Sequence, residues 1–179
     1  MIVVFLDFAK AFDSVPHRGL SAKLYAYGFR GKLLNWLIEY LNSRLQRVSV
    51  NGVVSDWSSV RSGVPQGSIL GPLLFLIFIN DLIDDLFHIC KLFADDSKLL
   101  AIIKNALDLD ALQDDLNRLS QWANKWSMRF NLDKCKTMYF GKPRLKRELT
   151  MVGDNGLIRA LTETKLERDL GIYVNSNLK

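Results

Sequence analysis

The stretch IVVFLD at residues 2–7 determines how the rest of this 179-residue chain is interpreted. Its five apolar residues are rich in β-branched side chains and predict a buried strand, which an aspartate follows directly. A second apolar run ends on acids in FADD at residues 93–96. A carboxylate at the end of a buried strand is unfavourable unless it binds a cation or another partner. If the two strands pair, Asp7, Asp95 and Asp96 meet at one edge of a sheet.

Three carboxylates held so close together repel one another unless cations neutralise them. Mg²⁺ suits such a site because it takes oxygen ligands and leaves coordination positions open for substrate phosphates, and Mn²⁺ is an alternative ion. Two ions would activate a hydroxyl nucleophile and stabilise the leaving oxygen of an in-line displacement. The simpler alternative is that Asp95-Asp96 is only a polar hairpin turn.

The composition indicates a folded, basic protein. Apolar residues make up 49% of the chain, which is enough for one sizeable domain with a core. The net charge of +5 favours a nucleic-acid partner. Four of the cations form a run, for which a solvated loop is the alternative: Lys142, Arg144, Lys146 and Arg147. Cys90 and Cys135 lie in apolar stretches without metal-type spacing, and we expect buried reduced thiols.

No targeting or membrane segment is visible in the sequence. The longest apolar run, residues 69–79, is interrupted by Gly71-Pro72 and is too short to span a bilayer. No basic leader precedes an apolar stretch at the N-terminus. We therefore expect an intracellular, soluble protein with no membrane partner.

Periodicity along the chain predicts an α+β domain with a mostly antiparallel sheet. The expected strands lie at residues 2–6, 88–93, 98–103, 135–140 and 170–174, and the expected helices at residues 20–27, 32–41, 69–86 and 109–126. Ser68 is placed to cap the third helix. A hairpin over residues 47–60 is expected to turn at Asn51-Gly52, and a tight turn at Asp95-Asp96. Trp36, Trp122 and Trp126 occur at helical spacing and are expected in the core.

Five motifs in order resemble those of reverse transcriptases. FLDFAKAFD at residues 5–13 resembles the first palm motif, GVPQGS at 63–68 with Gly71-Pro72 the second, and FADD at 93–96 the third. Residues 131–136 resemble the fourth motif, with its lysine at 134, and Leu170-Gly171 resembles the primer grip. The continuation of the second motif over residues 73–82 is similar to non-LTR retrotransposons of the jockey-like group.

The resemblance implies a right-hand polymerase palm, an RRM-like antiparallel sheet packed by helices. It implies an RNA-directed DNA polymerase that transfers deoxynucleotides to a primer 3′-hydroxyl by a two-metal mechanism, with RNA template, DNA primer and deoxynucleoside triphosphates as partners. Because the first motif begins the chain and the last one ends it, we expect residues 1–179 to form a partial palm domain with parts of the fingers. The N-terminal fingers, the thumb and the endonuclease of the polyprotein would be missing. The family also implies a location in cytoplasm and nucleus.

The resemblance also implies roles for individual residues. Asp7, Asp95, Asp96 and the backbone carbonyl of Phe8 would bind the metals, and Lys134 would be the general acid that protonates the leaving pyrophosphate. The nucleotide would contact Phe8, Ala9, Lys10, Ala11, Phe12, Gln66 and Gly67. The nucleic acid would contact Pro65, Gln66, Leu170 and Gly171.

Each role has a plainer alternative. Phe12 matches the steric gate, whose bulky ring would clash with a ribose 2′-hydroxyl, but an isolated phenylalanine is an ordinary core residue. Lys134 is otherwise a solvated lysine, Leu170-Gly171 a strand with a glycine bend, and Asp13 the cap of a helical turn rather than a ligand.

Three functions are therefore compared for this sequence. The first is an RNA-directed DNA polymerase. The second is an RNA-directed RNA polymerase, which shares the palm and against which Phe12 argues. The third is a truncated, inactive remnant that only binds nucleic acid.

Overall fold

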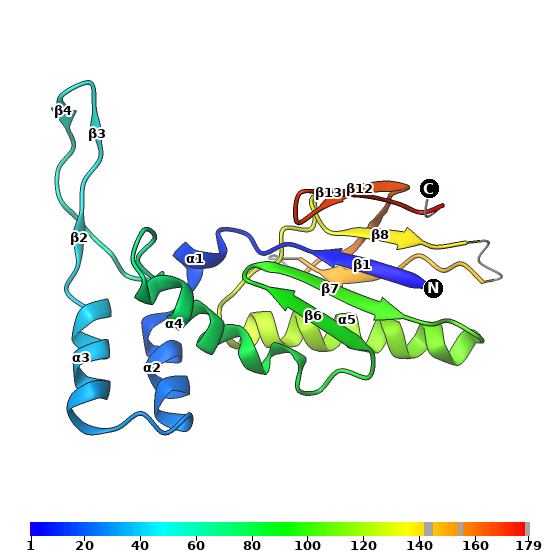
Figure 1. Ribbon diagram of the computed structural model, residues 1–179, viewed down its shortest axis with the longest axis horizontal. Coiled ribbons are helices and arrows are strands. Elements are labelled where there is room, and N and C mark those ends of the chain that lie inside the picture. The colour runs from blue at the N-terminus through cyan, green and yellow to red at the C-terminus, as the bar shows by residue number, and fades with distance from the viewer. Residues whose placement is uncertain (142–144, 154–155, 178–179) are drawn as a thin grey trace. The chain divides into compact units, whose positions relative to one another are not determined.

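The computed structural model describes residues 1–141, 145–153 and 156–177. They divide into two compact units, each of which is described by itself. We call Met1–Ala9 together with Asp81–Lys179 the sheet unit, and Lys10–Asn80 the helical unit. The elements of both are labelled in Figure 1.

The sheet unit is built around β1 (Ile2–Leu6), which lies between two other strands. The sheet order is β11-β8-β1-β7-β6, and its other strands are β6 (Ile89–Phe93), β7 (Asp96–Ala101), β8 (Lys136–Tyr139) and β11 (Thr162–Glu163). All neighbours are antiparallel except β8 and β11, so the expected mostly antiparallel sheet is confirmed. A central strand with both faces covered is apolar throughout, which explains the unbroken run at residues 2–6.

Helix α5 (Ala106–Lys125) lies along one face of this sheet (Figure 1). Its buried leucines recur every three or four residues and form one stripe: Leu109, Leu112, Leu116 and Leu119. The helix begins three residues before that stripe because Asn105 and Asp108 form a reciprocal capping box. Trp122 is half-buried, and its Nε1 donates a hydrogen bond to Asp81 at 2.8 Å.

Two short hairpins complete the sheet unit, and the sequence predicted neither correctly. β9 (Thr150–Val152) pairs with β10 (Ile158–Ala160), and β12 (Leu166–Asp169) pairs with β13 (Ile172–Asn175). The strand expected at 170–174 is present as β13 but begins only at Ile172, because Leu170 and Gly171 form the turn between β12 and β13 with φ of 47° and 85°. Two successive positive φ values are typical of the two-residue turn that matches strand twist.

The helical unit contains α1 (Ala11–Ser14), α2 (His17–Ala26), α3 (Gly31–Leu41) and α4 (Leu70–Ile79). Its core is formed mainly by leucine and phenylalanine side chains, including Leu20, Leu24, Leu41, Phe75 and Phe78. Ser68 was expected to cap α4, but the N-cap residue is Ile69; Ser68 Oγ, one residue earlier, accepts a hydrogen bond from the Gly71 amide of the first turn at 2.9 Å. The buried ammonium of Lys23 donates to the Phe78 carbonyl at 2.6 Å, near the negative end of that helix.

Helix α4 is shorter than the sequence predicted. It ends at Ile79, and a 3₁₀ turn, η1 (Asn80–Ile83), replaces the continuation expected to residue 86. The sequence there contains Asp81, Asp84 and Asp85. Carboxylates at the end of a helix are unfavourable because they face the partial negative charge of its last carbonyls.

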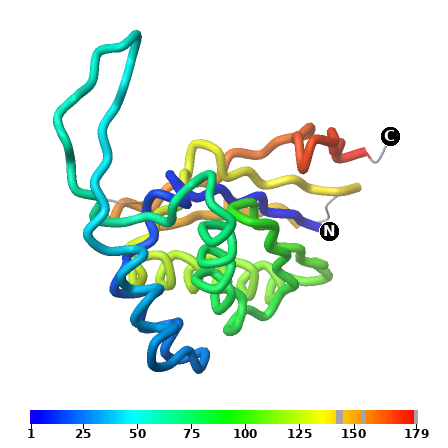
Figure 2. The backbone as a smooth tube through the Cα atoms, turned by 60° about the vertical axis from the view of Figure 1, so that its left-hand side comes forward, coloured from blue at the N-terminus to red at the C-terminus, as the bar shows by residue number. Residues whose placement is uncertain are grey.

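A long two-stranded ribbon extends away from α2 and α3 of the same unit (Figures 1 and 2). β2 (Leu45–Gln46) pairs with β5 (Ser58–Ser59), and β3 (Ser49–Val50) pairs with β4 (Val53–Val54) around Asn51-Gly52. The predicted hairpin is confirmed. Trp36 was expected in the core and is 51% exposed, because α3 buries Leu37 and Leu41 on its other side.

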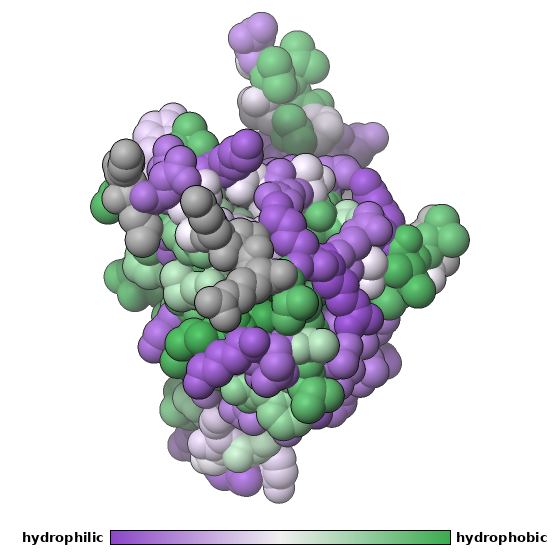
Figure 3. Space-filling model, turned by 90° about the vertical axis from the view of Figure 1, so that its right-hand side faces the viewer, coloured by the Kyte–Doolittle hydropathy of each residue, from purple (hydrophilic) through white to green (hydrophobic). Residues whose placement is uncertain are grey.

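The surface of the sheet unit mixes hydrophilic and apolar side chains (Figure 3). Two cations of the basic run form exposed ion pairs, Lys146 with Glu163 and Arg147 with Asp110; the other two, Lys142 and Arg144, lie outside the described residues. Exposed ion pairs of this kind contribute little to stability. Among the described residues, no helix is both long enough and apolar enough to cross a membrane.

Candidate active site

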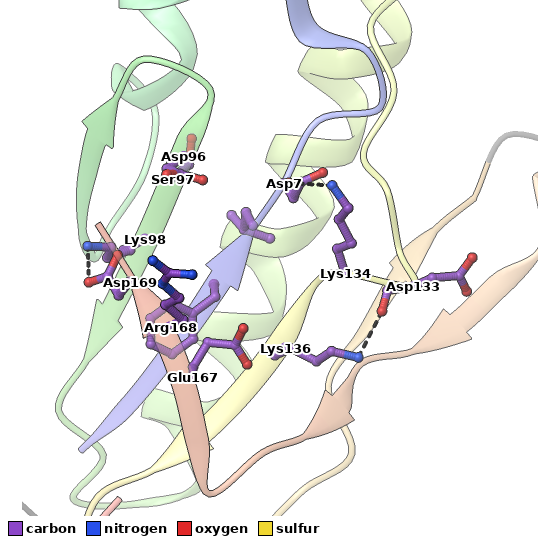
Figure 4. A pocket seen from close by; sticks show the side chains of 12 residues that line it. Asp7, Asp96, Ser97, Lys98, Asp133, Lys134, Lys136, Glu167, Arg168 and Asp169 are labelled. Atoms are coloured by element: carbon purple, nitrogen blue, oxygen red, sulfur yellow. Dashed lines mark hydrogen bonds and ion pairs between the residues drawn. The ribbon is translucent and has the colours of Figure 1, made fainter. Parts of the chain in front are cut away.

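The two acidic clusters come together through the pairing of β1 with β7. Leu6 lies opposite Ser97 in this antiparallel pair, so Asp7 at the end of β1 is beside Asp96 at the start of β7. Figure 4 shows Asp7 and Asp96 at the same end of neighbouring strands. The tight turn consists of Ala94 and Asp95 rather than Asp95 and Asp96, because Phe93 already pairs with Asp96. Asp96 is therefore part of the strand, and its position is fixed by the sheet.

The environment at this end of β1 and β7 disfavours a negative charge on Asp96 in addition to that on Asp7. Partial burial and the nearby carboxylates of Asp95, Asp7 and Asp169 raise the pKa of Asp96 above its ordinary value, while Lys98 opposes the shift. The Oδ1 atom of Asp7 is buried and has no hydrogen-bond partner. A buried acceptor without a partner is unfavourable, and a cation at this edge would relieve both conditions.

The carboxylate oxygens of Asp7, Asp95 and Asp96 fit a cation whose remaining ligands are water and phosphate oxygens. In the described parts of the chain, no three His, Cys, Asp or Glu side chains gather closely enough to enclose a metal. Mg²⁺ sites that handle phosphates commonly use one or two carboxylates and complete the shell with water and phosphate oxygens. The unpartnered Oδ1 of Asp7 beside Asp96 meets that requirement.

The raised pKa of Asp96 predicts how stability depends on pH. A carboxyl group whose pKa is raised on folding lowers the free energy of unfolding once it is ionised. This loss begins as pH rises above the ordinary pKa of 3.8 and is complete above the pKa of the folded state. We expect Asp96→Asn to increase the free energy of unfolding at neutral pH and to have no such effect near pH 3. Urea unfolding at both pH values measures this, with the exposed Glu39→Gln as control. A variant less stable than the unaltered chain at neutral pH would contradict it.

Lys134 is held next to Asp7 by backbone hydrogen bonds. The Asn131 amide donates to the Asp7 carbonyl at 2.8 Å, and the amides of Lys134 and Cys135 both donate to the Asn131 carbonyl. The resulting turn brings Lys134 Nζ to 3.4 Å from Asp7 Oδ2 (Figure 4). Lys134 is 65% exposed, so this ion pair adds little stability and leaves the ammonium accessible to a ligand.

Both cysteines are buried free thiols, as predicted. Burial raises the pKa of Cys135 to about 11, and its Sγ lies 3.8 Å from the Asp7 carbonyl. Burial, followed by the nearby carboxylate of Asp115, likewise raises the pKa of Cys90 to about 11. Thiols with such values stay protonated at neutral pH.

Phe8 packs in the core through its ring, and backbone bonds on both sides of it fix the direction of its carbonyl. The ring is 3% exposed and stacks on Phe130 with centroids 4.3 Å apart. The Asp7 carbonyl and the Ala9 amide bond to the segment at Arg129–Asn131. Because these bonds alternate along an antiparallel pair, the Phe8 carbonyl is directed away from that segment.

An open cleft of about 250 Å³ adjoins Asp7 and Asp96, and it contains residues that sequence reasoning missed. Lys98 of β7 forms an ion pair with Asp169 of β12 across this cleft (Figure 4). Strand alternation could have indicated Lys98, because it lies on the same face as Asp96. The other missed lining residues include Ser97, Asp133, Lys136, Glu167 and Arg168. Leu170 and Gly171, expected to contact primer, form the turn and are not in this lining.

The remaining predicted residues belong to the helical unit: Lys10, Ala11, Phe12, Pro65, Gln66 and Gly67. Phe12 is half-buried, and its ring stacks on Phe75 with centroids 4.6 Å apart, so one face is core while the side chain stays partly accessible. Ala11 is buried beside it, and Lys10 has a left-handed backbone with φ 51° at the start of α1.

The loop at residues 63–67 is fixed by contacts within the helical unit. Gln66 Nε2 donates to Asp13 Oδ1 at 3.0 Å. The expectation that Asp13 caps a helical turn is wrong, because Asp13 lies within α1 and the N-cap positions of α1 and α2 are Lys10 and Pro16. Gly67 has φ +80° with open space around it, whereas a Cβ at Gly71 would lie 2.2 Å from the Pro65 carbonyl. Glycine is therefore required sterically at Gly71, and at Gly67 it permits a left-handed backbone.

Comparison with known proteins gives a consistent result. A family model described as reverse transcriptase (RNA-dependent DNA polymerase) matches residues 1–167. The RNA-directed DNA polymerase from mobile element jockey of Drosophila melanogaster is 35% identical over 76% of this chain and 16% of its own length. The probable RNA-directed DNA polymerase from transposon BS of the same species is 32% identical over 98% of this chain and 20% of its own length.

A solved structure has a similar fold. Apo telomerase from Candida tropicalis, truncated from the C-terminal domain, matches 89% of this chain and 34% of its own with a TM-score of 0.57 at 16% identity. At that identity the likeness concerns the fold alone, a mixed α/β arrangement. The chain spans no more than a fifth of the length of the two Drosophila relatives, 16% of one and 20% of the other.

Proposed function

The chain belongs to the reverse transcriptase (RNA-dependent DNA polymerase) family, and we propose that it carries the nucleotidyl-transfer site of a non-LTR retrotransposon polymerase. In this proposal, a primer 3′-hydroxyl attacks the α-phosphate of a deoxynucleoside triphosphate selected by an RNA template. The observation that carries it is the pairing of Leu6 with Ser97, which sets Asp7 beside Asp96 at the start of β7.

Asp7 and Asp95 would hold two Mg²⁺ ions, with Asp96 and the Phe8 carbonyl assisting and Mn²⁺ as an alternative. When bound, the ions supply a lower pKa for the attacking hydroxyl and neutralise charge on the leaving oxygen. The unpartnered Oδ1 of Asp7 and the like charges that raise the pKa of Asp96 support this assignment. The carboxylates also orient the site, because strand pairing fixes Asp96 and Asp7 before any ligand binds.

Lys134 would donate its Nζ proton to the pyrophosphate oxygen as the bond to the α-phosphate breaks. Its ammonium is accessible and 3.4 Å from Asp7 Oδ2, which supports a position beside the reacting phosphates. Residues 8–12 with Gln66 and Gly67 would bind the nucleotide. Pro65 with Gln66, and Leu170 with Gly171, would contact template and primer.

Primer extension tests the proposal directly. The chain is incubated with a DNA primer on an RNA template, deoxynucleotides and Mg²⁺, and extension that disappears with EDTA is expected. Binding of the template–primer without any extension would instead favour a nucleic-acid-binding protein without polymerase activity.

Phe12 is proposed to exclude ribonucleotides, and its truncation tests this. We expect Phe12→Ala to reduce the preference for deoxynucleotides over ribonucleotides, measured as a ratio of kcat/KM values, by about 10- to 100-fold. Loss of the stack on Phe75 should also lower the free energy of unfolding by about 1 kcal/mol or more. Phe12→Tyr keeps the ring and serves as control. An unchanged ratio in Phe12→Ala would assign Phe12 to the core alone.

A further inference from the structure

The positive charge of the chain is concentrated in the helical unit. Lys10–Asn80 contains eight lysine and arginine residues and three acidic residues, so this unit carries the whole net charge of +5. The sheet unit is neutral by the same count. Such a distribution indicates that the helical unit contacts a polyanion.

Aromatic rings and arginines, of which Trp36 and Trp57 are exposed and Tyr40 and Arg44 half-buried, form a stripe on this unit. On α3, the rings of Trp36 and Tyr40 lie one turn apart and stack with centroids at 5.9 Å. The guanidinium carbon of Arg44, three residues beyond the end of α3, lies 5.9 Å from the centroid of the Tyr40 ring. Trp36 is 51% exposed, so its face is available to a planar ligand.

The stripe continues onto the ribbon. β2 begins directly after Arg44, and where it ends the guanidinium of Arg47 lies 4.6 Å from the centroid of the Trp57 ring. Trp57 is 60% exposed and precedes β5, the strand that pairs with β2. We call Trp36, Tyr40, Arg44, Arg47 and Trp57 the aromatic–arginine stripe.

A cavity of about 590 Å³ adjoins the stripe and is lined by three cations, Lys10, Arg44 and Arg61. Arg44 belongs to both features. Asp13 is the acid in this lining, and its Oδ1 accepts the hydrogen bond from Gln66. The cavity therefore presents mainly positive charge beside exposed rings, which suits a ligand with both phosphates and planar bases.

We propose that the aromatic–arginine stripe and the adjoining cavity bind single-stranded nucleic acid. Bases would stack on Trp36 and Trp57, and phosphates would pair with Arg44, Arg47 and Arg61. A duplex hides the faces of its bases, so these rings favour a single strand. The proposal extends the proposed function, since the template strand of a polymerase is a single strand where it enters the enzyme.

Fluorescence anisotropy tests this on the full chain without metal or nucleotide. The probes are a labelled RNA strand of about 20 nucleotides, a DNA strand of the same sequence and the corresponding duplex. We expect the double variant Trp36→Leu/Trp57→Leu to raise the Kd for single strands about 10-fold or more and to affect the duplex less. Arg44→Gln should weaken binding and reduce its dependence on salt concentration.

Two matched controls separate the stripe from general effects. Tyr25 is 56% exposed and also lies under an arginine, Arg30, but Arg30 Nη1 bonds the carbonyls of Tyr25 and Phe29 at the end of α2. Tyr25→Leu should leave the Kd unchanged. Arg18→Gln removes one charge at an exposed position of α2 outside the stripe, and it should weaken binding less than Arg44→Gln.

The outcomes distinguish this inference from the proposed function. Equal weakening in stripe and control variants, or no weakening in the tryptophan variant, would overturn the stripe even if the chain extends primers. Stripe-dependent binding by a chain that fails to extend primers would retain the inference and reject the polymerase activity. A loss confined to RNA would indicate contacts with the 2′-hydroxyl, and a loss with both strands would indicate bases and phosphates alone.

Discussion

Asp7→Asn is expected to reduce primer extension by about 10³-fold or more while leaving the fold at least as stable as that of the unaltered chain. Oδ1 of Asp7 is buried without a hydrogen-bond partner, and Oδ2 makes only a 3.4 Å ion pair with an exposed lysine. Asparagine has nearly the same volume and removes a negative charge beside Asp96. The loss of one exposed ion pair costs little by comparison.

The two measurements are single-turnover primer extension and urea unfolding. Asp133→Asn is the matched control, because Asp133 lines the same cleft but pairs with Arg159 at 2.7 Å and is 77% exposed. It should extend primers nearly normally. Asp95→Asn should lose extension as Asp7→Asn does. Retained extension in Asp7→Asn would reject the metal assignment, and a large loss of stability would assign Asp7 a structural role.

If Asp7→Asn stabilises the fold and abolishes primer extension, the carboxylates of Asp7 and Asp96 are present for function and not for stability. Nothing in the fold of the sheet unit requires a carboxylate at position 7, and the raised pKa of Asp96 shows that the folded state disfavours the full set of charges. Residues that oppose folding are retained for function in many enzymes. In the proposed function, the carboxylates at this edge are of that kind.

Sequence patterns predicted the sheet unit where local rules apply. The apolar run at 2–6 and the β6–β7 hairpin were recognised because the spacing of apolar residues and the chemistry of turns are local properties of the sequence. Two turn positions were misjudged for the same reason. Ala94 and Leu170 adopt φ of 51° and 47°, values that apolar residues rarely take, so the first turn was expected at Asp95-Asp96 and Leu170 was assigned to a strand.

Local sequence patterns could not predict contacts between residues that are far apart in the chain. Lys98 and Asp169 are 71 residues apart, and their ion pair depends on how the β12–β13 hairpin lies beside β7. Trp36 was expected in the core because large aromatic rings are often buried, but burial of apolar residues is only a tendency. Its exposure became apparent only from which side of α3 buries Leu37 and Leu41.

Asp115 is the residue that spacing could have revealed. It lies on the apolar stripe of α5, three residues after Leu112 and four before Leu119, and its side chain is fully buried. A charged residue at a core position is unfavourable unless it is paired and hydrogen-bonded. Its carboxylate accepts hydrogen bonds from the amides of Phe87 and His88, both at 2.9 Å, and from His88 Nδ1 at 2.8 Å.

Asp115→Asn is expected to lower the free energy of unfolding by about 3 kcal/mol. Asparagine offers one acceptor oxygen, and its amide hydrogens would face the backbone donors that the second carboxylate oxygen now satisfies. The segment that contains Phe87 and His88 leads directly into β6 and hence to the Ala94-Asp95 turn before Asp96. Hydrogen exchange at the amides of Ile89–Phe93 should accelerate together with the drop in stability.

The neighbouring acid supplies the control. Asp114 is exposed on the same helix, and Asp114→Asn should change the free energy of unfolding by less than about 0.5 kcal/mol in the same urea titration. Asp115→Leu separates packing from hydrogen bonding, since it fills the space with apolar atoms but leaves the Phe87 and His88 amides without an acceptor. It should therefore be no more stable than Asp115→Asn. A leucine variant as stable as the unaltered chain would mean that these amides find other partners, and that the buried carboxylate does not hold the segment before β6 in place.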